Sequence, residues 1–294
     1  MLIRRVATFT KSDSGIGFAS AWSPTGGEVA VAGFDDCVRG WNVATGQPTL
    51  TAHHAGTVPC VSWSPDGRTV ASGTSAGSVQ LFAAGSGQSI ARAAGHTDEV
   101  RSLAHSPSGA YLASAANDGT VRVWWAADLA PVATITAHAG LVRSVSWSPD
   151  SASLASGGHD NTLRVWNADG WTANGGLADH RSWIAAVAYS PDGRHLASAS
   201  GDGTVRVWNL AAARYAHVFD DFDGWGVSDL AYSPDGRHLA TIDMNPTMRV
   251  FEMVTGTVVA TANASYGSTA LSWSPDGRFL CSTGFEADIW SVTG

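Results

Sequence analysis

The sequence is poor in lysine and in charged residues generally. Of its 17 basic residues only Lys11 is a lysine, and charged residues make up 14% of the chain. The net charge is −8 and no basic run is longer than Arg4-Arg5, so the chain lacks the basic stripe that binding to nucleic-acid phosphates requires. Its 44% of hydrophobic residues is enough for a packed core, which argues against a disordered chain.

Long apolar runs and paired cysteines are absent as well. No stretch of about 18 apolar residues could cross a bilayer, and the first residues, MLIRRVATFT, lack the apolar core of a secretory signal. Cys37, Cys60 and Cys281 are far apart and have no CxxC spacing, which disfavours a disulfide framework and a zinc site. We expect a soluble, cytoplasmic monomer without metal or cofactor, which binds neither nucleic acid nor membrane.

What the sequence does contain is a repeat. A tetrapeptide resembling Ser-Pro-Asp-Gly occurs seven times, and its prolines lie at positions 24, 65, 107, 149, 191, 234 and 275. The steps between them are 41, 42, 42, 42, 43 and 41 residues, so one unit of about 42 residues accounts for the whole chain. We predict a single domain over residues 1–294.

Each unit has the pattern of four short strands. In the third unit, residues 100–106 alternate into a Pro-Ser-Gly turn, YLASAA follows, and Asn117-Asp118-Gly119 forms a tight turn before TVRVWW. PVATITAH supplies a fourth stretch, and no window has the periodicity of an amphipathic helix. Each unit is therefore expected to form one antiparallel sheet.

Three units share a set of His, Ser, Asp and Trp residues at one spacing. The sets are His96, Ser114, Asp118 and Trp124; His138, Ser156, Asp160 and Trp166; and His180, Ser198, Asp202 and Trp208. In this the chain resembles the WD-repeat family over essentially its whole length. The resemblance implies an all-β, seven-bladed propeller with four antiparallel strands in each blade.

Other units depart from this pattern. The second has Ala76 and Phe82 in place of the Asp and Trp, and the sixth has Asn245 and Phe251. The last unit ends at its third strand, whereas residues 2–9 precede the first unit. We predict that residues 2–9 form the outer strand of the last blade and close the ring, which removes exposed sheet edges.

Three motifs have a structural and a chemical interpretation. Gly73–Gly77 matches the G-x-S-x-G nucleophile elbow, but that elbow joins a strand to a helix and this segment lies between two strands. The repeated His, Ser and Asp have the residue types of a hydrolase triad, yet three copies with a Trp partner indicate a buried hydrogen-bond network. The acidic segment FDDFDGW lacks the full calcium-loop spacing and is expected to be solvated. No catalytic residue is assigned.

Residues that the repeat does not require are the candidates for function. Trp183 and Trp225 lie in loops that lead into an innermost strand; in propellers such loops form one face, the top, around a central channel. Asp229 stands where the other units have a small residue. The candidate partner-binding residues are Phe18, Trp183, Trp225 and Tyr266 as anchors, Glu99, Arg101 and Arg143 as orienting charges, and Asp229 as a channel carboxylate.

The resemblance implies a non-enzymatic scaffold that binds a protein or peptide through its top face. Trp225, Asp229 and the acidic segment favour a partner with a cationic side chain. The alternative is a small-molecule binding protein or enzyme with its site at the channel mouth. Trp183 and Trp225 could also simply fill space between loops, and the chain could be one unit of a longer multidomain protein.

Overall fold

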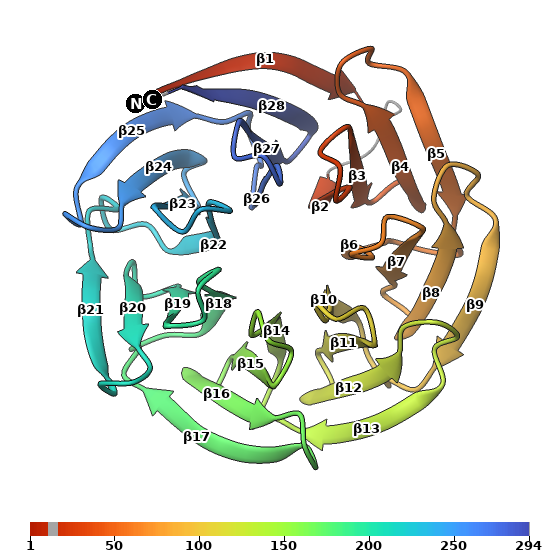
Figure 1. The fold of residues 1–294 in the computed structure, drawn as a ribbon, viewed down its shortest axis with the longest axis horizontal. Helices are drawn as coiled ribbons and strands as arrows, with labels where there is room; N and C mark the ends of the chain where they lie inside the picture. The colour runs from red at the N-terminus through yellow and green to blue at the C-terminus, as the bar shows by residue number, and fades with distance from the viewer. Residues whose placement is uncertain (11–16, 294) are drawn as a thin grey trace.

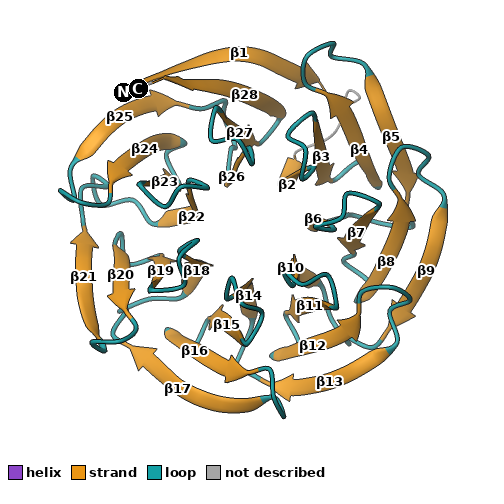
Figure 2. Ribbon diagram, viewed as in Figure 1, coloured by secondary structure: helices purple, strands orange, loops and turns teal. Residues whose placement is uncertain are grey.

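The seven repeats fold into seven sheets arranged in a ring (Figure 1). The computed structural model describes residues 1–10 and 17–293, and each of its sheets has four strands. This part of the chain contains strands, turns and loops (Figure 2), and none of it forms a helix that could cross a membrane. The all-β, seven-bladed propeller implied by the resemblance to the WD-repeat family is confirmed.

Each blade is an antiparallel meander whose first strand borders the central channel and whose fourth strand lies outside (Figure 1). Blades 1 to 3 are formed by β2 (Gly17–Trp22), β3 (Glu28–Gly33), β4 (Cys37–Asn42), β5 (Pro48–His53), β6 (Cys60–Trp63), β7 (Thr69–Gly73), β8 (Ser78–Ala83), β9 (Ser89–Ala94), β10 (Val100–His105), β11 (Tyr111–Ala116), β12 (Thr120–Trp125) and β13 (Pro131–Thr136). Blades 4 to 6 are formed by β14 (Val142–Trp147), β15 (Ser153–Gly158), β16 (Thr162–Asn167), β17 (Thr172–Ala178), β18 (Ile184–Tyr189), β19 (His195–Ser200), β20 (Val205–Asn209), β21 (Arg214–Phe219), β22 (Val227–Tyr232), β23 (His238–Asp243), β24 (Thr247–Glu252) and β25 (Val258–Asn263). Blade 7 consists of β26 (Ala270–Trp273), β27 (Phe279–Thr283), β28 (Glu286–Thr293) and β1 (Leu2–Thr10).

The ring is closed by the two ends of the chain, as predicted for residues 2–9. β1 pairs antiparallel with β28, from Leu2 opposite Thr293 to Thr10 opposite Glu286, and the labelled termini lie side by side in Figure 1. The observed strand is one residue longer than the predicted one. Blade 7 is thereby completed by residues from both ends of the sequence.

Hydrogen bonds from the inner strands join several blades to the one before them. The first-strand tryptophan Trp147 donates from its indole nitrogen to the carbonyl of Ala104 on the preceding blade, at 3.0 Å, and Trp273 does the same to Ala231 at 3.1 Å. His105 occupies this position in blade 3 and instead contacts Ser62 Oγ at 3.0 Å through Nδ1. This contact also joins blade 3 to the blade before it.

A buried hydrogen-bond chain ties a loop of each regular blade to its sheet. In blade 3, Trp124 Nε1 donates to Ser114 Oγ at 2.8 Å, and this hydroxyl lies 2.7 Å from His96 Nε2. His96 Nδ1 lies 3.0 Å from Asp118 Oδ2, which also accepts the backbone N–H of Thr97. Blades 4 and 5 repeat the chain through His138, Ser156, Asp160 and Trp166 and through His180, Ser198, Asp202 and Trp208. The predicted structural network is confirmed.

Blades 2 and 6 have other hydrogen bonds at the positions of the His, Ser, Asp and Trp set. In blade 2, His54 Nε2 lies 3.2 Å from Ser72 Oγ, but Ala76 replaces the Asp and His54 Nδ1 is buried without a partner. In blade 6, Arg249 donates to Asp243 at 2.5 Å and to Asp223 at 3.0 Å. An arginine bridging two carboxylates thus stands in for the His–Asp pair.

Blade 7 has a fully buried carboxylate, Asp288, at the closure. Thr8 on β1 donates to Asp288 Oδ1 at 2.7 Å, and Ser265 donates to Oδ2 at 2.5 Å. Arg5 on β1 lies 3.6 Å from the same carboxylate. Because a buried carboxylate needs compensating partners, β1 contributes charge and hydrogen bonding as well as an edge.

Candidate functional site

One face of the ring is built from the loops that lead into the first strands and from the turns between the second and third strands. Backbone hydrogen bonds join loop and turn within a blade: Asn117 N–H donates to Glu99 O at 2.9 Å, and Gly201 N–H donates to Trp183 O at 3.0 Å. We call this the top face. The segment Gly73–Gly77 is one of its strand-to-strand turns, as expected, and not a nucleophile elbow.

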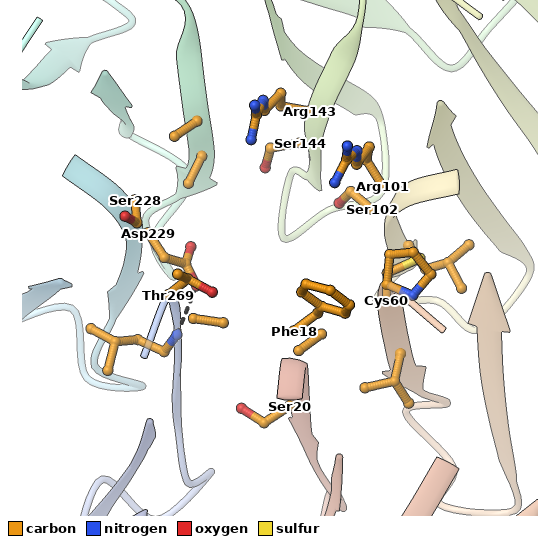
Figure 3. A pocket seen from close by; sticks show the side chains of 18 of the residues that line it. Phe18, Ser20, Cys60, Arg101, Ser102, Arg143, Ser144, Ser228, Asp229 and Thr269 are labelled. Carbon is orange, nitrogen blue, oxygen red and sulfur yellow. Dashed lines mark hydrogen bonds between the residues drawn. The ribbon is translucent and has the colours of Figure 1, made fainter. Parts of the chain in front are cut away.

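The central channel opens on the top face as a cavity of about 550 Å³. Five of the eight candidate residues line it: Phe18, Arg101, Arg143, Trp183 and Asp229. Figure 3 shows Arg101 and Arg143 next to each other on one side of the opening and Asp229 on another side. The channel wall is therefore cationic on one side and carries a carboxyl group on the other.

Arg101 is held by two polar neighbours. Its Nε donates to Asn117 Oδ1 at 3.0 Å, and its Nη2 lies 3.3 Å from Glu99 Oε2. Glu99, the sixth candidate, thus acts on the channel by pairing with Arg101.

Arg143 is fixed between two rings. Its Nε donates to His159 Nε2 at 2.9 Å, and its guanidinium carbon lies 4.5 Å from the centroid of the Trp183 ring. Burial lowers the pKa of Arg143, and the neighbouring charge of Arg101 lowers it further, although arginine keeps its charge at neutral pH. Trp183 covers the turn at Gly201, where a Cβ atom would lie 2.6 Å from the indole ring. Trp183 therefore packs between loops and also positions Arg143.

Asp229 bridges blades 6 and 7. Its two carboxylate oxygens accept the backbone N–H groups of Leu230 at 2.8 Å and Leu271 at 2.7 Å. The second bond is the dashed line at Asp229 in Figure 3. Burial raises the pKa of Asp229 to about 7, and the two N–H bonds only partly oppose that rise. The hydroxyl oxygens of Ser102 and Ser144 accept the equivalent bonds from backbone N–H groups of the next blade. Asp229 therefore combines an inter-blade bond with a titratable group at the channel.

The remaining two candidates lie on the top surface, outside the channel lining. Tyr266 is 81% exposed and its ring stacks on Phe285 with centroids 5.9 Å apart. Trp225 is about half exposed, in the loop before β22. Trp183, by contrast, lies against Arg143 and His159 at the channel.

Three exposed apolar residues that sequence reasoning did not single out belong to the same surface. Phe34, Met244 and Phe285 occupy the turns between the second and third strands of blades 1, 6 and 7. The regular blades have Asn117, His159 and Gly201 at this position. Comparing that one turn position across all repeats would have identified them.

We call this surface the apolar arc; it spans the three neighbouring blades 6, 7 and 1. Phe18 at the channel packs on Phe34 with ring centroids 4.4 Å apart, so the arc is continuous with the channel mouth. The arc consists of Phe34, Trp225, Met244, Tyr266 and Phe285.

The acidic segment beside Trp225 is partly neutralised within the fold. Asp223 pairs with Arg249, whereas Asp220 and Asp221 are exposed, and the intervening Phe222 is fully buried. Over residues 1–10 and 17–293, no three His, Cys, Asp or Glu side chains come together in a way that could hold a metal ion.

Comparison with known proteins agrees with this architecture. Residues 74–289 match the family model described as "IFT122 first beta-propeller", and residues 46–82 match the model described as "WD domain, G-beta repeat". A search of curated proteins finds no match. Since the first match covers well over half of the sequence, the chain belongs to the family that this model describes, and it is a WD-repeat β-propeller.

Proposed function

We propose that this propeller is a non-enzymatic interaction scaffold that binds a segment of a protein partner across its top face. WD-repeat propellers commonly serve as interaction scaffolds, which supports the general role. The observation that carries the proposal for this surface is the apolar arc beside the channel. Five large apolar side chains, each at least 44% exposed, gather there on three neighbouring blades.

The chemistry of the arc suits a peptide segment. Contiguous exposed apolar patches on soluble proteins mark interaction sites, and aromatic side chains bury a large area with few rotatable bonds to immobilise. The turns and loops that carry these side chains are held to each other by backbone hydrogen bonds, such as Met244 N–H to Gly226 O at 2.9 Å. A preorganised surface loses less conformational entropy when it binds.

We further propose that a cationic side chain of the partner contacts the acidic side of this surface. Asp220 and Asp221 are exposed and lie close in sequence to Trp225, whose ring could add a cation–π contact. The variant Asp220→Asn/Asp221→Asn is expected to weaken partner binding and to reduce its dependence on salt concentration, measured by titration calorimetry.

The proposal is tested with peptides selected from a random display library against the immobilised protein. Tyr266→Ser is expected to weaken the selected peptides at least about tenfold, because a central aromatic anchor contributes strongly to binding. The matched control is Val254→Ser, which removes an apolar side chain of similar exposure, 85% against 81%, from the turn between β24 and β25 at the other end of blade 6.

The docking proposal is wrong if no selected peptide competes for the top face. It is equally wrong if Val254→Ser weakens binding as much as Tyr266→Ser does. Thermal unfolding of both variants verifies that the fold is intact.

A small-molecule site or enzyme at the channel mouth is the second candidate function. One observation favours it: Asp229, with its pKa raised to about 7 by burial, lines the 550 Å³ cavity, and perturbed carboxyl groups in cavities are often functional. A metabolite library screened by ligand-observed NMR tests it. A hit that Asp229→Asn abolishes would support this function, and a screen without Asp229-dependent hits would reject it.

The expected cellular setting is part of the proposal. Cys37 and Cys60 are buried and form no disulfide, which supports a reducing, cytoplasmic location. We also propose a monomer, which sedimentation at several concentrations tests.

A further inference from the structure

The channel wall formed by blades 3 and 4 presents hydrogen-bond donors that lack an acceptor. Arg143 uses Nε on His159, and no carboxylate among residues 1–10 and 17–293 forms an ion pair with it. Its stacking on Trp183 fixes the plane of the guanidinium group. The two terminal nitrogens of Arg143, on a residue that lines the channel, are therefore available to a ligand.

Arg101 and two serines extend this donor surface. Arg101 uses Nε and Nη2 on Asn117 and Glu99, which leaves Nη1. The hydroxyl oxygens of Ser102 and Ser144 accept the backbone N–H groups of the next blades, so their protons are free to be donated elsewhere. Figure 3 shows both serines beside the two arginines at the channel.

The charge of this cluster fits a singly charged group. His159 Nε2 accepts the bond from Arg143, so this ring is neutral when the bond forms, and burial followed by the charge of Arg143 lowers its pKa. With two arginines and Glu99 the cluster carries a net charge of +1. A doubly charged phosphate would be left undercompensated, whereas a carboxylate matches both the charge and the planar pair of donors on Arg143.

We propose that the channel mouth binds the carboxylate of an acidic side chain of the protein partner, held by Arg143 and Arg101. This inference rests on the docking function proposed above and names a group that the docked segment carries. A side chain is favoured over a free small acid because the site is continuous with the apolar arc. Phe18 lines the same channel and packs on Phe34, so one segment can place an apolar residue and an acidic residue side by side.

The first experiment tests the anion site on the full chain with acetate as the probe. Acetate is titrated at constant ionic strength while the arginine Nε–Hε signals are followed by NMR. A saturable shift of the Arg143 signal is expected, with inorganic phosphate binding more weakly. The signal itself is identified by its loss in Arg143→Lys.

The affinity of each variant for acetate is then measured by titration calorimetry, with chloride used to keep the ionic strength constant. Arg143→Lys keeps the charge but lacks the planar donor pair, so binding is expected to be at least about tenfold weaker. Arg68→Gln is the matched control, because Arg68 is an exposed arginine in the turn between β6 and β7, at the other end of a blade, and it is expected to bind acetate as wild type does. No saturable shift, equal binding by Arg143→Lys, or tighter binding of phosphate would overturn the carboxylate site.

The second experiment tests the source of the carboxylate with the selected peptides. Each acidic residue of a selected peptide is replaced by its amide. At least one such replacement is expected to weaken binding to the wild-type protein about tenfold. The same replacement is expected to leave binding to the Arg143→Gln variant unchanged, because that variant already lacks the partner of the carboxylate. Peptides that depend on Tyr266 but not on any acidic residue would leave the docking function standing and overturn this inference. Acetate binding at Arg143 with no peptide binding at all would overturn both the docking function and the assignment to a partner's side chain.

Discussion

The hydrogen-bond chain of blade 2 lacks the tryptophan donor and the carboxylate that blades 3 to 5 have, because Phe82 and Ala76 take their places. Where Asp118 bonds both His96 Nδ1 and a backbone N–H, Ala76 leaves His54 Nδ1 buried and unpaired. Burial, with a further effect of the charge of Arg92, lowers the pKa of His54 to about 4. The site therefore keeps a neutral imidazole with half of its hydrogen-bonding capacity unused.

Ala76→Asp is expected to stabilise the protein. The new carboxylate would accept a bond from His54 Nδ1 and raise the pKa of this histidine above its present value of about 4. A gain of about 1 kcal/mol in the free energy of unfolding is expected, measured with urea, and Asp118→Ala in blade 3 is expected to lose a similar amount or more. A neutral or destabilising Ala76→Asp would show that the loop of blade 2 cannot adopt the regular geometry.

Acid is expected to weaken the fold through His105. Burial lowers its pKa from 6.5 in the unfolded chain to about 4 in the folded protein. The unfolded chain thus binds the proton more readily, so this contribution is complete above pH 6.5 and is lost as the pH falls toward about 4. The loss amounts to about 3 kcal/mol for the fully titrated site.

His105→Tyr removes that dependence, because Tyr189 and Tyr232 occupy the same position in other blades. The variant is expected to lose less stability than wild type between pH 7 and pH 4.5, compared by urea unfolding at each pH. Identical slopes for the two proteins would contradict the role assigned to His105.

At the scale of single residues, the sequence was enough to identify site residues that depart from the repeat. It did not predict the contacts between side chains at the site. Asp229 was recognisable because six equivalents are small. The bond from Arg143 to His159 lies within blade 4, and the stacking of Arg143 on Trp183 joins blade 4 to blade 5. Neither contact is encoded by a pattern of residue types along the chain. Phe34 and Phe285 lie in turns outside the framework positions, so the framework pattern does not identify them.

Among the structural elements, β1 has a role that its own sequence only partly indicates. Its charged and apolar residues do not form a clear alternating pattern, yet the count of strands in the last repeat required a partner for β28. The structure adds that Phe9 is buried against Trp41, with ring centroids 5.5 Å apart, and that Thr8 reaches Asp288. The position of the strand was thus predictable, whereas the contacts that hold it were not.

Phe9→Ala is expected to destabilise the closure. Removing a buried aromatic ring costs about 3 kcal/mol, which corresponds to a fall of roughly 6–12 °C in the melting temperature of a domain of this size. Deleting residues 2–10 is expected to lower it further, because β28 loses its neighbour and Asp288 loses Thr8. Val6→Ala, at a half-exposed position of the same strand, is the control and should change little. A deletion that melts like wild type would refute the importance of β1.

On the scale of the whole molecule, the top face is divided between two kinds of blade. Blades 3 to 5 carry the regular His–Asp pairs and the charged side of the channel, whereas blades 6, 7 and 1 carry the apolar arc. The division was partly foreseeable, since blades 6 and 7 depart from the regular set in sequence and blade 1 has Val31 in place of the serine, although blade 2 departs from it as well. The apolar arc is continuous with the channel because Phe18 packs against Phe34. This contact is visible only in the fold.

A closed ring is expected to unfold in one transition, because every blade packs on two neighbours. Asp202→Ala in blade 5 and Phe9→Ala at the closure should each shift the same urea midpoint. Their combination should be additive within about 0.5 kcal/mol, since the two sites share no partner. The unfolding transition would be followed by far-ultraviolet circular dichroism and by tryptophan fluorescence. Separate midpoints for the two probes would show that blades unfold independently.

The pairing of β1 with β28 also sets an order of events during synthesis. Of the 28 strands of the ring, β1 is made before the others and cannot pair until β28 has emerged, which at 5–20 residues per second takes roughly 15–60 s. During that interval β1 has no sheet to join, and the aromatic ring of Phe9 has no pocket. Blade 7 is therefore assembled only after translation has passed through every other blade, and a nascent chain stalled before β28 holds six complete sheets and an unpaired leading strand.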